Sequence, residues 1–340
     1  MKKISILGMG RWASCIAYIL NKSKFKVTMW ERGTNGGSQL FKTHSNQYLT
    51  LPKTIKFTHD LDKAVDEAEV VVISIYSQNL DDLMSRLKKV RGYQSKHYCI
   101  AMKGVEASTG RRLTRIMIDA GVLRDKIAVW AGPGHVQSIS TGGATNMVIS
   151  AYEEKYAKEL AAAFSNDSVR ISTCADIVGI EFCSACKNVY GIAAGILQAR
   201  PKYSHCIGSL MVASLKEMAE FVDAFGGEAK TASSLALLGD YQATMFDSYS
   251  KNLTYGKTIV EKNTRDANIL KEFIVVNTVE GIKTAQAIIK LKEEYNFGVS
   301  DSLRLKMDIA QVVCDVVCGK VKLKDAPDIL FKTISEVIAR

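Results

Sequence analysis

The segment that most constrains this chain lies near its beginning, where an apolar run at residues 4–7 leads directly into residues 8–13, Gly-Met-Gly-Arg-Trp-Ala. This spacing, directly after a first strand, predicts a strand–turn–helix unit. Gly8 permits the tight turn, Gly10 lets the backbone approach a ligand, and Ala13 lets the helix pack closely on the strand. The N–H groups and positive dipole end of such a helix attract an anion. The segment therefore predicts a Rossmann domain that binds a dinucleotide, with Arg11 and Trp12 at its pyrophosphate.

The first half of the chain alternates short β-branched runs with helical patterns, which predicts a mainly parallel, doubly wound α/β sheet. The expected strands are residues 4–7, 26–30, 70–75, 97–101, 127–131 and 146–150. The expected helices between them are residues 12–21, 80–89 and 111–120.

From about Asp176 onward, long helical patterns follow one another. They cover residues 176–198, 210–225, 233–237, 268–292, 302–318 and 326–339. We therefore predict two domains, a dinucleotide-binding Rossmann domain at 1–175 and an all-helical substrate and catalytic domain at 176–340.

The second expected strand ends at Glu31 and Arg32. An acidic side chain at this point accepts hydrogen bonds from the adenine ribose and repels a 2′-phosphate, so Glu31 favours NAD. The neighbouring Arg32 suits the 2′-phosphate of NADP. The pair favours NAD and leaves NADP possible.

The formal net charge of +10 is compatible with nucleic acid, an anionic membrane or an anionic small molecule. The basic residues are scattered and follow no nucleic-acid-binding pattern, so an anionic cofactor and substrate explain the charge better. The apolar start is interrupted at Gly8 and followed by Arg11, and no stretch is long enough to span a bilayer. We expect a cytoplasmic protein without membrane insertion. Most of the eight cysteines lie in apolar helical patterns, and the Cys183–Cys186 pair is expected to pack in the core; no metal site is expected.

In order and spacing, motifs along nearly the whole chain resemble those of the NAD(P)-dependent sn-glycerol-3-phosphate dehydrogenase family. The most specific is Lys187-Asn188 followed after three residues by Ile-Ala-Ala-Gly. The matching segments are residues 8–12, 51–55, 77–78, 102–106, 131–135, 176–181, 186–195, 238–240, 251–252 and 279–281. The resemblance implies interconversion of dihydroxyacetone phosphate and sn-glycerol 3-phosphate, a role in phospholipid or polyol-phosphate synthesis, and a homodimer.

The resemblance also implies roles for individual positions. Lys187 matches the catalytic lysine, and Lys103 a second active-site lysine that lies near both substrate and cofactor. Asp240 and Thr244 match residues around the substrate, and Asn188 one beside the catalytic lysine. Lys251 and Asn252 match the Arg-Asn pair that binds the substrate phosphate, and Glu280 matches a residue on the cofactor side.

The reduction of a ketone needs a hydride on carbon and a proton on oxygen, and we expect Lys187 to act as the general acid/base. Burial and a nearby Lys103 would lower the pKa of Lys187, and Asp240 would orient the amine and limit that shift. A solvated helix lysine is the alternative, but the surrounding residues are apolar around much of the helix. Lys103 as a strand-end charge and Asp240 as a helix cap are likewise the structural alternatives.

Several positions depart from the family pattern. Lys251 stands where the family has Arg, and a lysine offers a point charge in place of a planar fork; Lys257 is a second candidate for the phosphate. Tyr76 replaces a Pro, and Gly134 replaces a Ser. Further departures are Gln137, Ser138 and the loop at residues 33–50. Two alternatives therefore remain: a dehydrogenase for another phosphorylated or carboxylated keto compound, and a non-catalytic NAD-binding regulator.

Overall fold

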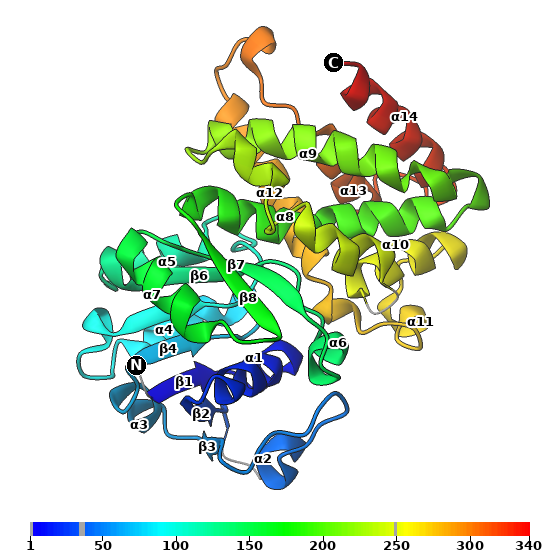
Figure 1. Ribbon diagram of the computed structural model, residues 1–340. Coiled ribbons are helices and arrows are strands. Elements are labelled where there is room, and N and C mark those ends of the chain that lie inside the picture. The colour runs from blue at the N-terminus through cyan, green and yellow to red at the C-terminus, as the bar shows by residue number, and fades with distance from the viewer. Residues whose placement is uncertain (1–2, 34–37, 248–249) are drawn as a thin grey trace. The chain divides into compact units, whose positions relative to one another are not determined.

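The computed structural model describes residues 3–33, 38–247 and 250–340 (Figure 1). The chain divides into two compact units, Met1–Lys103 with Leu113–Ile177, and Gly104–Arg112 with Val178–Arg340. The sequence-predicted domains, 1–175 and 176–340, did not include the excursion at Gly104–Arg112. This segment joins the second unit through an ion pair of Arg112 with Glu181 at 2.7 Å and through Gly110, which packs against Leu291.

The first unit contains one eight-stranded sheet in the order β3-β2-β1-β4-β5-β6-β7-β8. All neighbouring pairs are parallel except β6 and β7, which are antiparallel. The strands are β1 (Lys3–Leu7), β2 (Lys26–Trp30), β3 (Lys56–Thr58), β4 (Val70–Ile73), β5 (His97–Ile100), β6 (Ile127–Ala131), β7 (Thr145–Ala151) and β8 (Val169–Cys174). The predicted α/β class with a mainly parallel sheet is confirmed.

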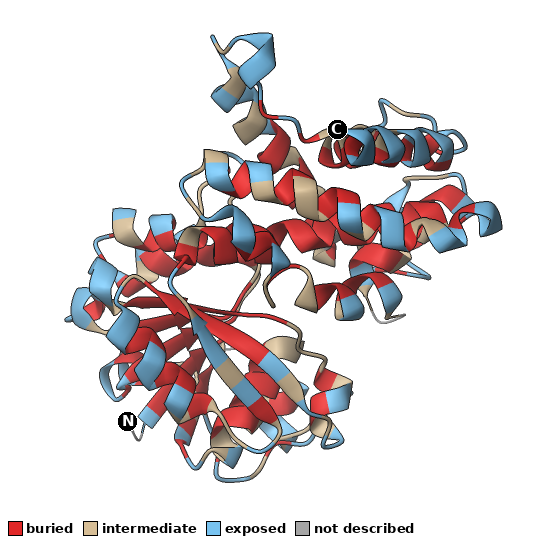
Figure 2. Ribbon diagram, turned by 45° about the horizontal axis from the view of Figure 1, so that its top comes forward, coloured by how far each residue is buried: buried red, intermediate tan, exposed pale blue. Residues whose placement is uncertain are grey.

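Seven helices of the first unit are described. They are α1 (Arg11–Lys22), α2 (Gln39–Thr43), α3 (Leu61–Asp66), α4 (Leu80–Leu87), α5 (Leu113–Asp119), α6 (Val136–Ser140) and α7 (Glu154–Phe164). The central strands are buried on both faces, as expected for parallel strands covered by helices (Figure 2).

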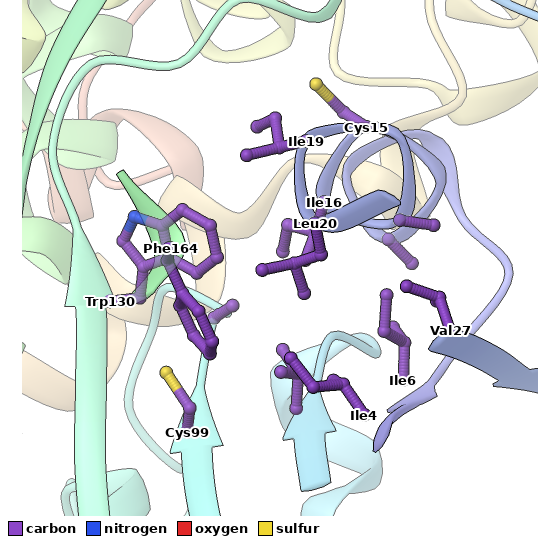
Figure 3. Packing of buried hydrophobic residues seen from close by; sticks show 14 of the residues in the cluster. Ile4, Ile6, Cys15, Ile16, Ile19, Leu20, Val27, Cys99, Trp130 and Phe164 are labelled. Atoms are coloured by element: carbon purple, nitrogen blue, oxygen red, sulfur yellow. The ribbon is translucent and has the colours of Figure 1, made fainter. Parts of the chain in front are cut away.

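The core beside β1 shows how the first helix is held on the sheet (Figure 3). Ile16 and Leu20 of α1 are fully buried against a cluster that includes Ile6 of β1. Phe164 adds an aromatic contact, because its ring lies 5.4 Å from that of Trp130 between centroids. This packing sets the position of the turn between β1 and α1.

The edge strand β3 and the strand β8 were not predicted. β3 has only three residues, and β8 exposes Arg170, Ser172 and Thr173, so neither shows a clear apolar pattern. Both are held mainly by backbone hydrogen bonds to a neighbouring strand, and these leave little trace in side-chain periodicity.

The second unit is helical, and its described residues include no strand beyond an isolated bridge between Val105 and Arg112. Its helices are α8 (Ile177–Gln198), α9 (Ile207–Ala224), α10 (Lys251–Glu261), α11 (Ala267–Leu270), α12 (Glu280–Asn296), α13 (Asp308–Val317) and α14 (Ala326–Ala339). None of the described helices is both long and apolar enough to cross a membrane.

The predicted helix at 268–292 is wrong as one element, because the structure ends α11 at Leu270 and starts α12 only at Glu280. Val275 and Val276 are β-branched and disfavour a continuous helix, and the backbone N–H of Gly281 donates to the Asn252 side chain. Similarly, no α-helix forms at 233–237, and α13 begins at Asp308 rather than at 302.

Close backbone contact joins α8 to α10. A Cβ on Gly195 would lie 2.1 Å from the carbonyl oxygen of Leu253, and a Cβ on Gly256 would lie 2.1 Å from that of Ile192. Both positions therefore exclude every larger residue unless the helices separate. This crossing places the start of α10 beside Asn188.

Candidate active site

The turn between β1 and α1 has the backbone geometry expected for an anion site. Gly8 adopts φ +136°, and a Cβ at this position would lie 2.1 Å from the carbonyl oxygen of Ser74. Gly10 precedes α1, and apart from its two chain neighbours no described residue has an atom within 4 Å of where its Cβ would stand. The first turn of α1 carries no acidic residue, and the described residues supply no side-chain cap for it. The N–H groups at this helix end therefore suit a phosphate group.

Arg11 and Trp12 flank this turn. The guanidinium of Arg11 lies over the ring of Tyr48 at 5.6 Å, and Asn46 donates to Ser14 of α1 at 3.1 Å. A Cβ on Gly134 would lie 2.4 Å from the indole of Trp12, which gives a steric reason for glycine at position 134. Tyr48 and Asn46 belong to the loop at 33–50, of which residues 34–37 lie outside the described residues.

Glu31 and Arg32 follow β2 with separate partners. The carboxylate of Glu31 accepts the backbone N–H of Ser38 at 2.9 Å. The guanidinium of Arg32 forms an ion pair of 3.0 Å with Asp82. Asp82 was not singled out in the sequence, because nothing in its spacing relates it to Arg32.

Lys103 lies beyond the carboxyl end of β5, and its ammonium donates to the carbonyl oxygen of Gly132 at 3.3 Å. Gly132 follows the parallel neighbour β6. Gly8, Glu31 and Lys103 therefore share the carboxyl edge of the sheet, where ligands of doubly wound folds bind.

In the second unit, Lys187 of α8 lies in a buried polar cluster. Its Nζ is 2.8 Å from Oδ2 of Asp240 and 2.8 Å from Oγ1 of Thr244. Thr244 donates its own proton to the carbonyl oxygen of Asp240 at 2.8 Å, so its hydroxyl accepts from the lysine. The three residues are between 1% and 7% exposed, which argues against a solvated helix lysine.

Asp240 and Thr244 come from a segment of unusual helical geometry. Gly239–Tyr241 forms a 3-10 turn and Gln242–Phe246 forms a π-helical turn. Single π turns often occur at functional sites, because they redirect side chains within a helical segment. The spacing between residues 240 and 244 does not by itself predict this turn.

A second group of polar side chains adjoins Lys187 along α8. Asn188 donates to Glu280 at 3.3 Å and accepts from Asn252 at 3.0 Å. The oxygen of Asn252 accepts the backbone N–H of Gly281 at 3.0 Å, so Asn252 caps α12 from another helix. Lys251 differs from these residues because it is exposed, at the first position of α10.

The sequence assigned Lys251 and Asn252 together to the substrate phosphate, and their surroundings differ. The amide of Asn252 is buried among Asn188 and Gly281, whereas Lys251 is exposed beside the N–H groups of α10. Lys257, the other candidate, lies 3.8 Å from Glu261.

A further group of buried polar side chains joins α8 to α9 and α13. Tyr190 donates to Glu217 of α9 at 3.0 Å. The carboxylate of Glu217 also accepts the backbone N–H groups of Ile309 and Ala310, at 2.8 and 3.1 Å, where α13 begins. Burial raises the pKa of Glu217 to about 7, although these hydrogen bonds act in the opposite direction.

Comparison with known proteins covers both units. The family model for the NAD-dependent glycerol-3-phosphate dehydrogenase N-terminus matches residues 3–157, and the model for its C-terminus matches residues 176–328. The glycerol-3-phosphate dehydrogenase [NAD(P)+] of Lactobacillus helveticus is 31% identical over 88% of this chain and 90% of its own length. This chain belongs to the NAD-dependent glycerol-3-phosphate dehydrogenase family. It is an NAD(P)-dependent dehydrogenase.

Two other glycerol-3-phosphate dehydrogenases match this chain over nearly its whole length. The glycerol-3-phosphate dehydrogenase [NAD(P)+] of Syntrophomonas wolfei is 28% identical over 100% of this chain and 99% of its own length. Among solved structures, the glycerol-3-phosphate dehydrogenase of Coxiella burnetii has a TM-score of 0.85 and covers 100% of this chain and 99% of its own, at 22% identity. The latter similarity concerns the fold.

The cofactor that this glycerol-3-phosphate dehydrogenase family uses fits the residues at the β1–α1 turn. The open space at Gly10 admits a pyrophosphate, and the uncapped first turn of α1 offers it N–H donors. Glu31 is placed at the end of β2 where a ribose hydroxyl is bound in such folds. Sequence reasoning missed Asp82 and Gly256, because only contacts between distant segments reveal them.

Proposed function

We propose that this chain interconverts dihydroxyacetone phosphate and sn-glycerol 3-phosphate with NAD(H) or NADP(H), and that Lys187 is the general acid/base. Family membership supports the reaction. The observation that carries the role of Lys187 is its buried amine, 2.8 Å from both Asp240 and Thr244. A charge in such a place is costly unless it is paired or functional.

The nicotinamide, when bound, supplies the hydride that reaches the carbonyl carbon. The chain must then supply the proton and stabilise the negative charge that develops on the carbonyl oxygen. An ammonium on Lys187 does both, because it donates the proton from the atom that faces the charge. Asp240 and Thr244 hold that nitrogen in one direction, and Lys103 contributes a second positive charge to substrate and cofactor.

The phosphate of the substrate is assigned to the start of α10. Lys251 supplies a positive charge there, and the first turn of this helix carries no acidic residue. Ser250 caps this helix by accepting the N–H of Leu253, and the helix dipole with the remaining N–H groups adds to the attraction of an anion. Asn252 acts indirectly in this proposal, because it donates to Asn188, which lies beside the lysine and in turn donates to Glu280.

The family relationship supports three further assignments. We assign the enzyme to the cytoplasm, to glycerophospholipid or polyol-phosphate synthesis, and to a homodimer. Size-exclusion chromatography with light scattering tests the dimer: a mass of one chain at working concentration would contradict it.

The deciding experiment follows NADH absorbance when purified protein is mixed with dihydroxyacetone phosphate, with NADPH and unphosphorylated dihydroxyacetone in parallel. We expect rapid consumption that requires the phosphate. Activity only with another phosphorylated or carboxylated ketone would identify the alternative dehydrogenase, which the replacement of Arg by Lys251 favours. NADH binding without turnover of any ketone in a broad panel would indicate a regulator.

A further inference from the structure

An ion-pair network joins the end of β2 to α4. Nη1 of Arg32, directly after Glu31, lies 3.0 Å from Oδ2 of Asp82. The same carboxylate oxygen accepts Nε of Arg86 at 3.1 Å. One acidic side chain therefore pairs with two guanidinium groups and offsets one of their two positive charges, next to Glu31, which the proposed function assigns to the adenine ribose.

The topology brings this network to the dinucleotide edge of the sheet. β2 and β4 flank β1 on its two sides, and all three strands are parallel. α4 begins seven residues after the end of β4, so its first turn lies on the same carboxyl side. The side chains of Arg32 and Asp82 are 54% and 49% exposed, so a ligand can reach both.

We propose that Asp82 is a specificity-determining residue that favours NAD(H) over NADP(H). This inference rests on the cofactor site of the proposed function. A 2′-phosphate binds best to a guanidinium group that no carboxylate occupies, and Asp82 holds both Arg32 and Arg86 and offsets one of their two positive charges. Glu31 repels the same phosphate, so the two acidic residues act in one direction.

The weakness of exposed ion pairs shapes the test. Each pair contributes little to folding, so removal of Asp82 leaves the domain intact. The negative charge of Asp82 nevertheless acts on a bound anion at short range. Removal of Asp82 would also free the guanidinium groups of Arg32 and Arg86, which bind phosphate well.

The test measures nucleotide binding to the full chain without any ketone, by fluorescence titration with NADH and with NADPH. Wild type is expected to bind NADH more tightly. In Asp82→Asn we expect the NADPH dissociation constant to fall by about five- to tenfold, and that for NADH to stay within about twofold. Asp62→Asn, an exposed acid of α3, is the matched control for net charge and should change neither constant. Arg32→Ala combined with Asp82→Asn should cancel most of the gain.

An unchanged NADPH-to-NADH ratio in Asp82→Asn, with NADH binding intact, would overturn this inference alone. A weaker affinity for NADPH would also overturn it, because Asp82 would then be orienting Arg32 for the phosphate. An equal gain in Asp62→Asn would overturn it by reducing the effect to net charge. Wild-type protein that binds neither nucleotide would overturn the proposed function together with this inference.

Discussion

The two units of this chain build their candidate sites from different materials. In the first unit, the β1–α1 turn is made of backbone, and its key residues, Gly8 and Gly10, are neighbours in sequence. In the second unit, the cluster around Lys187 consists of buried side chains from distant segments. We therefore expect ligand binding and folding to be separable at the backbone site, with Gly8 required for the turn and Gly10 for the approach of the ligand. At the side-chain cluster we expect them to be coupled, because Lys187, Asp240, Thr244, Asn188 and Asn252 are all buried.

The largest effect is expected at the side-chain cluster. Lys187→Ala should lower turnover by about a hundredfold or more, because the proton donor at the carbonyl oxygen is lost. The NADH dissociation constant should stay within about twofold, since the dinucleotide turn lies in the first unit. Steady-state kinetics and fluorescence titration measure the two quantities.

Two controls accompany this variant. Lys271→Ala removes an exposed lysine of the same unit and should leave turnover unchanged. Lys187→Met with Asp240→Asn avoids an unpaired buried charge, so it separates catalysis from folding. Turnover of Lys187→Ala within about threefold of wild type would remove Lys187 from the mechanism.

At the backbone site, Gly8 and Gly10 should respond differently to the same substitution. Gly8→Ala should destabilise the fold by about 2–3 kcal/mol, because its positive φ and the Ser74 carbonyl both oppose a Cβ. Gly10→Ala should leave the free energy of unfolding within about 0.5 kcal/mol of wild type and weaken NADH binding about tenfold. Urea denaturation and fluorescence titration distinguish them. Equal stability losses in both variants would show that the turn does not separate folding from binding.

Asn252 tests the coupling within the helical unit. Asn252→Ala should cost about 2 kcal/mol of unfolding free energy, because Asn188 and the N–H of Gly281 lose a buried partner. Turnover should fall as well. Urea denaturation at one pH measures the first effect, and Asn268→Ala, an exposed asparagine, is the control. A stability equal to wild type would mean that water replaces the amide without cost.

The smallest expected effect is the pH dependence of stability that comes from Glu217, the buried carboxyl group of α9 that accepts from Tyr190. Its raised pKa of about 7 means that the native state holds the proton more tightly than the unfolded state. Stability should therefore fall as pH rises from the unfolded pKa toward 7, by about 1 kcal/mol between about pH 5.5 and 6.5. Glu217→Gln should flatten this slope, and Glu220→Gln, exposed on the same helix, should not. Urea denaturation across this range is the measurement, and an unchanged slope in Glu217→Gln would assign it to other groups.

Much of the fold could be predicted because it depends on local patterns. The strands at 26–30 and 127–131 and the helix at 326–339 have the predicted bounds. The short edge strand β3 could not be predicted, because backbone pairing with β2 rather than side-chain burial defines it. The break between α11 and α12 was missed because Asn252, whose oxygen accepts from Gly281, belongs to another helix.

For the candidate site, the sequence predicted which residues take part but not which residues they contact. Lys187 was predicted as a buried lysine from the apolar circumference of its helix, and in the structure Lys187, Asp240 and Thr244 are all buried. The different surroundings of Lys251 and Asn252 could not be predicted, because the partners of Asn252 lie on other helices, α8 and α12. Nor could the Arg32–Asp82 pair, because its members follow different strands.

By itself, the sequence determined the dinucleotide turn, the parallel sheet and the helical character of the second half. Glycine conformation and hydrophobic periodicity depend on residues that are close in sequence, so both can be recognised from the sequence itself. Only the tertiary structure decided which polar side chains meet: Lys187 with Asp240 and Thr244, and Asn252 with Asn188. Buried polar groups need hydrogen-bond partners, and these lie on neighbouring helices. Which partners are in reach depends on how closely the helices cross, as α8 and α10 do at Gly195.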